Sequence, residues 1–161
     1  MTEKKQPSLT HLDESGAARI VDITDRDVTH RTARVTGRVL ISQTVVELIE
    51  KNGISKGNVL EIARIAGIMG AKKTSELIPL CHPIAITGVD LKVVLGDGAI
   101  EISATVKTTD RTGVEMESFT TVSVAALTII DMIKAVDPTA SIESIALQEK
   151  DGGKNGHWVR P

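Results

Sequence analysis

The sequence is very poor in aromatic side chains. Only 1% of its 161 residues are aromatic, namely Phe119 and Trp158, and there is no tyrosine. Sheets that hold single-stranded nucleic acid stack several bases on exposed aromatic side chains. The net charge is −2, from 19 basic and 21 acidic residues, and gives no support for general binding along a phosphate backbone. The lack of aromatic side chains and the lack of net positive charge both argue against a nucleic-acid partner. The net charge does not exclude a local basic cluster.

Cysteine is equally scarce, since Cys81 is the only one in the chain. A single cysteine forms no disulfide within a chain and supplies no cysteine-rich zinc site. The four histidines are scattered without paired ligand spacing, so we expect no resident metal. A chain without a disulfide framework is typical of a reducing compartment, and we expect a cytoplasmic protein.

Long hydrophobic runs are also lacking. No stretch approaches the roughly 20 apolar residues of a membrane span, and the polar residues 1–6 are not followed by an apolar signal segment. We therefore expect no membrane partner. The composition, 41% hydrophobic and 25% charged, is that of a folded globular protein. We expect a flexible N-terminus over residues 1–10 and a single domain over residues 11–161.

Hydrophobic periodicity divides the chain into helices and strands. The predicted elements are a strand over residues 33–41, helices over 43–51 and 58–73, strands over 89–93 and 100–106, a helix over 114–136 and a strand over 141–150. Residues 74–83 are expected to be irregular, and residues 151–156 to form a glycine-rich loop. This order predicts an α+β fold of the ferredoxin-like, split βαβ plan. We expect a four-stranded antiparallel sheet with helices on one face and an extra helix after the first strand.

The predicted helix over residues 114–136 has two different faces. One carries an apolar stripe at helical spacing, made of Val122, Ala126, Ile129, Ile133 and Val136. The opposite face is mixed, with Thr120, Ser123, Leu127, Asp131 and Lys134. Such a helix fits between the sheet and a second subunit, so we predict an oligomer. A monomer with a few exposed aliphatic side chains is the alternative.

Asp131 and Lys134 are three residues apart and share a helix face. They form either a plain surface ion pair or a partly buried acid and amine that exchange protons. Lys56 stands just before the helix that begins near Asn58, where an anion could bind. Lys150 and Lys154 bracket a glycine-rich loop that could close over phosphates. Each of these lysines could equally be a solvated surface residue.

The second group of candidates lies near the two prolines of the irregular segment and at the start of the long helix. His82, held between Cys81 and Pro83, is either a ligand-binding group or general acid, or a solvated loop histidine. Cys81 is most simply a small buried side chain. Glu115 and Glu117, on either side of Met116, either stabilise the helix dipole or line a pocket.

Taken together and in order, four segments are far more specific than any single residue. They are LTHLDESGAARIVDIT, KGNVLEIARIAGIMGAKKTSELIPLCHPI, KTTDRTGVEMESFTTVSVAALTIIDMIKAV and KDGGKNG. Over residues 9–158 the chain closely resembles the molybdenum cofactor biosynthesis protein C family, the cyclic pyranopterin monophosphate synthases. The blocks LIPLCHP and TGVEME are the most specific parts of this resemblance.

The resemblance implies an activity and an assembly. Members convert (8S)-3′,8-cyclo-7,8-dihydroguanosine 5′-triphosphate to cyclic pyranopterin monophosphate and diphosphate, early in molybdenum cofactor biosynthesis. The family fold is ferredoxin-like, and members form a homohexamer, a trimer of dimers with sites at subunit interfaces. The implied partner is therefore a small nucleotide or pterin substrate. No cofactor is implied, and Mg²⁺ accompanying the triphosphate is compatible with the sequence although no ligand motif calls for it.

The resemblance also implies roles for particular residues. Asp131, Lys134 and Lys56 match the catalytic aspartate and lysines. The matching substrate-binding residues are Leu80, Cys81, His82, Glu115, Met116, Glu117, Lys150 and Lys154, the last two on the triphosphate. Two positions depart from the common pattern, because Ile130 replaces an aromatic residue and Ile133 a cysteine; both are packing positions. The competing interpretations are a non-enzymatic ligand sensor and a purely structural assembly subunit.

The shortage of aromatic residues limits the kinds of contact that can hold such a substrate. With so few rings available, stacking on aromatic side chains is not the main contact to a pterin-like ring. We expect hydrogen bonds from Glu117 and from backbone groups instead, with Met116, Leu80 and the imidazole of His82 against the ring faces.

Overall fold

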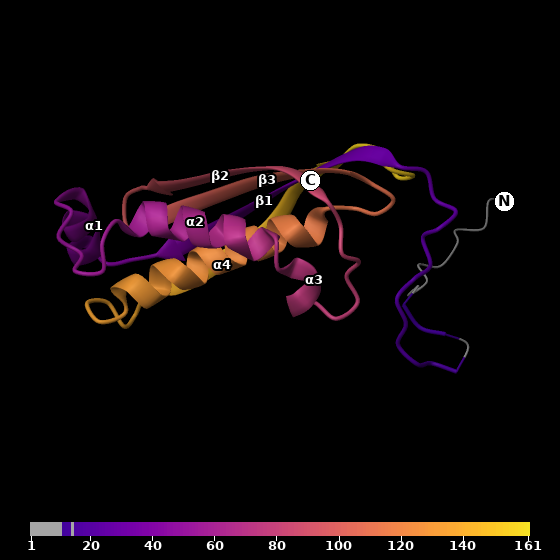
Figure 1. The fold of residues 1–161 in the computed structure, drawn as a ribbon. Helices are drawn as coiled ribbons and strands as arrows, with labels where there is room; N and C mark the ends of the chain where they lie inside the picture. Colours follow the sequence, from indigo (N-terminus) through magenta and orange to yellow (C-terminus); the bar gives the residue numbers. More distant parts are fainter. Residues whose placement is uncertain (1–10, 14) are drawn as a thin grey trace.

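The computed structural model describes residues 11–13 and 15–161, so the flexible N-terminus expected over residues 1–10 lies outside the described residues. The chain has an α+β architecture in which helices pack on an antiparallel sheet (Figure 1). Its elements are β1 (Thr29–Leu40), α1 (Gln43–Glu50), α2 (Val59–Ala71), α3 (Thr74–Leu77), β2 (Ile86–Leu95), β3 (Ala99–Asp110), α4 (Glu115–Ile133), β4 (Ser141–Asp151) and β5 (Trp158–Val159).

Within the described residues the sheet has five strands in the order β2-β3-β1-β4-β5, and every neighbouring pair is antiparallel. The four strands expected from the sequence are all present, but a sheet of only four strands is wrong. The fifth strand, β5, is two residues long and pairs with the end of β4. The segment expected to be irregular also contains the short helix α3. Neither element is long enough to show a period, which is why the sequence pattern missed both.

One face of the sheet is apolar and lies under the helices. On β1 the buried side chains alternate with half-buried polar ones, and Val35 and Val39 are fully buried. Ile100 and Ile102 of β3 join them in the main core. The other face is polar, and there Arg38 bonds carboxylates on both neighbouring strands, Glu101 and Glu143, each at 2.8 Å. The alternation of the strands therefore separates a packed face from a charged one.

Helices α2 and α4 approach each other closely because glycine stands at their contact. A Cβ atom on Gly67 would lie 2.8 Å from the carbonyl oxygen of Thr121 and 2.6 Å from a methyl group of Leu91. The α2 helix starts as predicted, since the side chain of Asn58 accepts a hydrogen bond from the Glu61 amide at 3.1 Å. The two helices lie side by side over the sheet (Figure 1).

The α4 helix buries most of its predicted stripe, since Val122, Ala126, Ile129 and Ile133 are fully buried. Val136 lies beyond the end of the helix and is half exposed. Thr120, expected on the opposite face, is also buried, in the N-terminal half of α4.

The length and composition of α4 would suffice for a membrane span, contrary to the expectation that no stretch comes close to one. However, 56% of its most apolar window is buried inside the fold, as in the core helix of a globular protein. Its packing against the sheet and α2 accounts for its apolar character.

Candidate active site

The candidate site residues lie in two groups at opposite ends of α4. Asp131 and Lys134 are at its C-terminal end, whereas Glu115, Met116 and Glu117 form its first turn. At 1.5 Å per residue, the backbones of Met116 and Asp131 are about 22 Å apart along the helix. A single chain therefore does not bring all of the candidate residues into one pocket.

The first group, which we call the lysine–aspartate cluster, consists of Lys56, Asp131 and Lys134. Lys134 Nζ lies 2.7 Å from Asp131 Oδ1, and Lys56 Nζ lies 3.0 Å from Asp131 Oδ2. Lys56 also donates to the Asp131 carbonyl oxygen at 2.7 Å. The two ammonium groups stand at the negative end of the helix dipole, which favours them there. The fold thus brings Lys56 next to Asp131, which lies 75 residues further along the chain and is already paired with Lys134.

The cluster fixes the charge of its carboxylate. Hydrogen bonds from Lys134 and Lys56, with their positive charges, lower the pKa of Asp131 from 3.8 to about 2. Asp131 is therefore ionised at neutral pH and serves to hold the two ammonium groups rather than to donate a proton. The Asp131 side chain is 57% exposed in the single chain. In the single chain both side chains of the Asp131–Lys134 pair are exposed, so their burial in a shared patch would need a second subunit.

The second group lines a cavity of about 350 Å³ at the start of α4. All six candidates from the irregular segment and from the first turn of α4 take part in it: Leu80, Cys81, His82, Glu115, Met116 and Glu117. The remaining lining residues are His11, Val21, Arg26, Thr112 and Gly113. The two sequence blocks that carry the resemblance most specifically therefore meet in one cavity.

Glu117 is the buried acid of this cavity. Glu117 is only 4% exposed. Burial raises the pKa of its carboxyl group to about 7, and the negative charge of Glu115 raises it further. Burial and the charge of Glu117 also raise the pKa of the Cys81 thiol. Glu117 can therefore carry or release a proton near neutral pH, while Cys81 remains an unreactive thiol.

His82 is bonded to the backbone of the N-terminal segment. Its Nε2 lies 2.7 Å from the carbonyl oxygen of Val21. Because a carbonyl oxygen only accepts, we assign the proton to Nε2, which leaves Nδ1 as the second polar atom of the ring. The Nε2 proton is engaged in this bond, so His82 supports the cavity wall as well as lining it.

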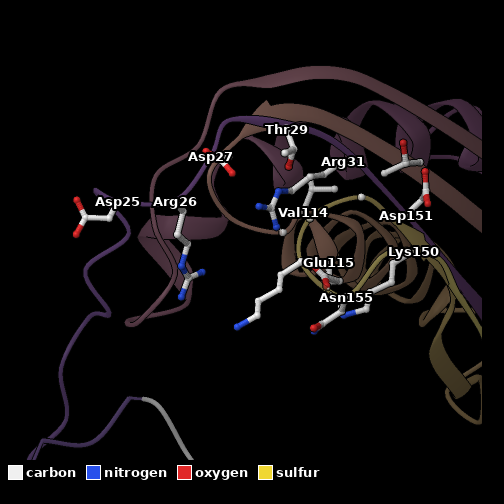
Figure 2. A pocket seen from close by; sticks show the side chains of 15 residues that line it. Asp25, Arg26, Asp27, Thr29, Arg31, Val114, Glu115, Lys150, Asp151 and Asn155 are labelled. Atoms are coloured by element: carbon white, nitrogen blue, oxygen red, sulfur yellow. Dashed lines mark hydrogen bonds and ion pairs between the residues drawn. The ribbon is translucent and has the colours of Figure 1, made fainter.

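A larger cavity of about 700 Å³ adjoins the first, and the two share Arg26, Gly113 and Glu115 (Figure 2). Lys150 and Lys154 line it, as expected for residues of the glycine-rich loop. Lys150 Nζ lies 2.9 Å from Glu115 Oε1, which joins β4 to the start of α4. The substrate-binding candidates therefore line two neighbouring cavities with three lining residues in common.

The glycine-rich loop depends on glycine at two successive positions. Gly152 and Gly153 have φ angles of +92° and +71°. A Cβ atom on Gly152 would collide with the His30 carbonyl oxygen, and one on Gly153 with the guanidinium of Arg31. The loop thus packs its backbone directly on the start of β1, and larger residues would displace it.

Sequence reasoning missed the lining residues that precede β1 or begin it, above all Arg26 and Arg31. Arg31 donates to the carbonyl oxygens of Asp110 and Arg111 at 3.2 and 3.1 Å. The charged stretch DRDVTHR was their only signal, and it shows neither a helical nor a strand period over its first residues. Within residues 11–13 and 15–161, no three His, Cys, Asp or Glu side chains come together as a metal site.

Comparison with known proteins identifies a family and several close relatives of the chain. The sequence profile of the MoaC family matches residues 20–153. The chain is 62% identical over 155 residues to a cyclic pyranopterin monophosphate synthase of Streptomyces avermitilis, covering 96% of this chain and 91% of the relative. It is 55% identical over 159 residues to cyclic pyranopterin monophosphate synthase 2 of Mycobacterium tuberculosis strain H37Rv, covering 99% and 95%. A synthase of the same name from Parvibaculum lavamentivorans is 54% identical over 152 residues, covering 93% and 95%. The chain belongs to the MoaC family.

Proposed function

We infer that the chain is a cyclic pyranopterin monophosphate synthase, an enzyme of molybdenum cofactor biosynthesis that acts on a pterin-forming nucleotide. The observation that carries this is the 62% identity to a synthase of that name over nearly the whole of both chains. The substrate is the cyclic dihydroguanosine triphosphate, and the products are cyclic pyranopterin monophosphate and diphosphate. Neither a ligand sensor nor a structural subunit requires a cation cluster and a buried titratable acid together.

We propose that each active site is composite and lies between subunits. The separation of about 22 Å between the two groups on α4 supports this, because one small substrate cannot touch both in a single chain. In a two-fold dimer with its axis perpendicular to α4, the helices run antiparallel, and the start of one meets the end of the other. The lysine–aspartate cluster of one subunit then faces the cavities of its partner.

The outward surface of the helical layer supports the same assembly. Ile65 and Met69 of α2 and Leu127 of α4 are 58%, 61% and 60% exposed, although all three are large apolar side chains. Such side chains on neighbouring helices favour burial against another copy of the chain. We propose a homohexamer built as a trimer of dimers, in which this surface is covered.

The base-derived ring is proposed to bind in the smaller cavity. Glu117 in its ionised form accepts two N–H groups from the pyrimidine edge of the ring, a pattern that suits a carboxylate. Met116 and Leu80 provide apolar contacts for the ring faces, and His82 provides its imidazole. With one phenylalanine and one tryptophan in the chain, hydrogen bonds rather than aromatic stacking dominate recognition.

The triphosphate is proposed to bind in the larger cavity, against Lys150 and Lys154. In the last chemical step a ribose-derived hydroxyl attacks the innermost phosphorus, loses its proton, and the bond from that phosphorus to the bridging oxygen of diphosphate breaks. Such a step needs positioning and neutralisation of charge on the departing diphosphate, which the two lysines and the backbone of the glycine-rich loop supply.

Lys134 and Lys56 are proposed to move protons during ring opening and ring rebuilding. These steps add and remove protons at nitrogen and oxygen atoms of the purine-derived ring, which is general acid–base chemistry. Asp131 holds both ammonium groups at hydrogen-bond distance and thereby fixes where they act. Asp131 is thus a positioning carboxylate for two catalytic lysines.

Two broader proposals accompany the function. The ferredoxin-like plan over a single catalytic domain of residues 11–161 is supported by the strand order β2-β3-β1-β4 and by one main core cluster. Residues of β1, β2, β3, α1, α2 and α4 are buried in this cluster, and Ile145 and Leu147 of β4 pack against it. A cytoplasmic location is supported by the single cysteine and the lack of a disulfide framework.

The function is tested by supplying the purified chain with the cyclic dihydroguanosine triphosphate and following products by mass spectrometry. We expect equal amounts of diphosphate and cyclic pyranopterin monophosphate. Binding without either product would favour the sensor, and no binding would favour the structural subunit; each result would reject the synthase.

A further inference from the structure

We propose that Arg111 is a positioning residue that holds residues 21–26 beside the larger cavity, so that Arg26 joins Lys150 and Lys154 as a third cation for the triphosphate. This rests on the proposed binding of the triphosphate in that cavity. We call residues 21–26 the strap. Figure 2 shows Arg26 on the indigo N-terminal segment, across the cavity from Lys150 and Asn155.

Arg111 bonds the strap through its backbone. One guanidinium nitrogen of Arg111, Nη1, donates to the carbonyl oxygens of both Thr24 and Arg26, the latter at 2.9 Å. Arg111 lies in the turn between β3 and α4, 85 residues further along the chain than Arg26. A charged donor forms stronger hydrogen bonds than a neutral one, so this contact sets where the end of the strap lies.

The strap has little apolar packing, so hydrogen bonds determine its position. Only Val21 and Ile23 are half-buried, and the other four strap residues are exposed. Asp22 folds the strap locally by accepting bonds from the amide and hydroxyl of Thr24, at 2.9 and 2.7 Å. The start of the strap is bonded to His82 through the carbonyl of Val21. His82 and Arg111 therefore fix its two ends.

The turn that carries Arg111 is bonded to Arg31 of β1, and the glycine-rich loop packs on the same Arg31 side chain. The Arg111 amide donates to Asp110 Oδ1 at 2.7 Å, and Arg31 bonds the carbonyls of Asp110 and Arg111. The backbone of Gly153 lies directly against the Arg31 guanidinium, since a Cβ atom there would be only 2.8 Å from Cζ. The strap is thus bonded to the turn directly, and the loop that carries Lys154 is linked to it through Arg31.

The charges around the cavity show which cations can receive an anion. Asp25, Asp27, Glu115 and Asp151 line it together with Arg26, Arg31, Lys150 and Lys154. Lys150 is paired with Glu115, and Arg31 is bonded to backbone carbonyls. Among the described residues, neither Arg26 nor Lys154 makes an ion pair. The planar guanidinium of Arg26 can bind two phosphate oxygens at once, which an ammonium group does less specifically.

The test measures binding of inorganic triphosphate to the full chain by calorimetry, with five variants. Arg26→Met and Arg111→Met are each expected to weaken binding by about tenfold, the effect of losing one charge-assisted bond. The double variant should bind no more weakly than either single one, because Arg111 acts through Arg26. Arg111→Lys keeps a charged donor and should recover most of the affinity. Arg19→Met removes a charge from the same N-terminal segment, outside the cavity lining, and should change nothing.

Hydrogen exchange separates positioning from direct contact. Peptides that cover the strap should exchange faster in Arg111→Met but not in Arg26→Met, since Arg26 takes part in the Arg111 bond only through its backbone. Unchanged strap exchange in Arg111→Met, or additive losses of affinity in the double variant, would overturn the proposal. Binding of inorganic triphosphate does not depend on turnover. If the variants show the expected binding and exchange but the parent chain forms no product, the proposed synthase function is rejected and the role of Arg111 stands.

Discussion

Replacement of Glu117 by glutamine should reveal the energetic cost of a buried acid. In the folded chain burial raises the pKa of Glu117 from 4.5 to about 7, whereas the unfolded chain exposes this side chain to water. The folded state therefore binds the proton more tightly than the unfolded state. The resulting stability is fully present below pH 4.5 and is lost as the pH rises through 7. Glutamine keeps the shape of the neutral acid and has no proton to lose.

The shift sets the size of the effect. A change of one pKa unit corresponds to 1.36 kcal/mol, so the rise from 4.5 to about 7 corresponds to at most about 3 kcal/mol. Relative to the parent chain, Glu117→Gln should gain stability steadily between pH 4.5 and 8, by up to about that amount. Asp131 does not interfere, because its pKa is lowered to about 2 and its contribution is lost only below about pH 4.

The free energy of unfolding is measured by urea denaturation of both chains from pH 4.5 to 8.5. The matched control is Glu50→Gln, which removes an exposed carboxylate from α1 and against which the pH dependence at Glu117 is compared. A constant difference between Glu117→Gln and the parent chain across the range would refute the reasoning. It would show that Glu117 is solvated as well in the folded chain as in the unfolded one.

Three further predictions address the site and the packing. Lys56→Ala and Lys134→Ala should retain the oligomer by analytical ultracentrifugation but lose product formation in the mass-spectrometric assay; normal turnover by either variant would remove that lysine from the mechanism. Mixing subunits of Lys134→Ala with those of Glu117→Ala should restore up to about a quarter of the sites if each site spans a two-fold dimer, and the mixture would stay inactive if every site lay within one chain. Gly67→Ala should lower the unfolding free energy by roughly 1–3 kcal/mol, because the new methyl group meets the backbone of α4, whereas Gly88→Ala meets nothing within 4 Å and serves as the control; equal stability of the two variants would contradict the close packing of α2 on α4.

Much of the fold was predictable because its strands are long and have one buried face. The alternation around Val35 and Val39, and around Ile100 and Ile102, predicted β1 and β3 correctly, and the Asn58 cap marked the start of α2. The strand β5 was not predictable. It has only two residues and owes its place to pairing with β4, a contact that local sequence does not encode.

The candidate site was predictable only within each local segment. Glu115 and Glu117 lie in one helical turn, so their joint position follows from the helix itself. The meeting of Lys56 with Asp131 depends on how the turn before α2 packs on α4, and neither residue signals it. The strap escaped notice because His82 and Arg111 hold its backbone carbonyls, and a carbonyl acceptor can belong to any residue.

The lysine–aspartate cluster and the residues Glu115, Met116 and Glu117 lie at opposite ends of one uninterrupted helix. The length of α4 therefore fixes the distance between them. Each residue of an α-helix adds about 1.5 Å of length and about 100° of rotation. A single insertion between Met116 and Asp131 would therefore swing the aspartate away from Lys56 while leaving the cavity at the other end unchanged. Variation in length should be tolerated in the connecting loops but not in this stretch. The spacing of 15 residues between Met116 and Asp131 thus serves as a sequence criterion for the relative placement of the two groups, independent of any single side chain.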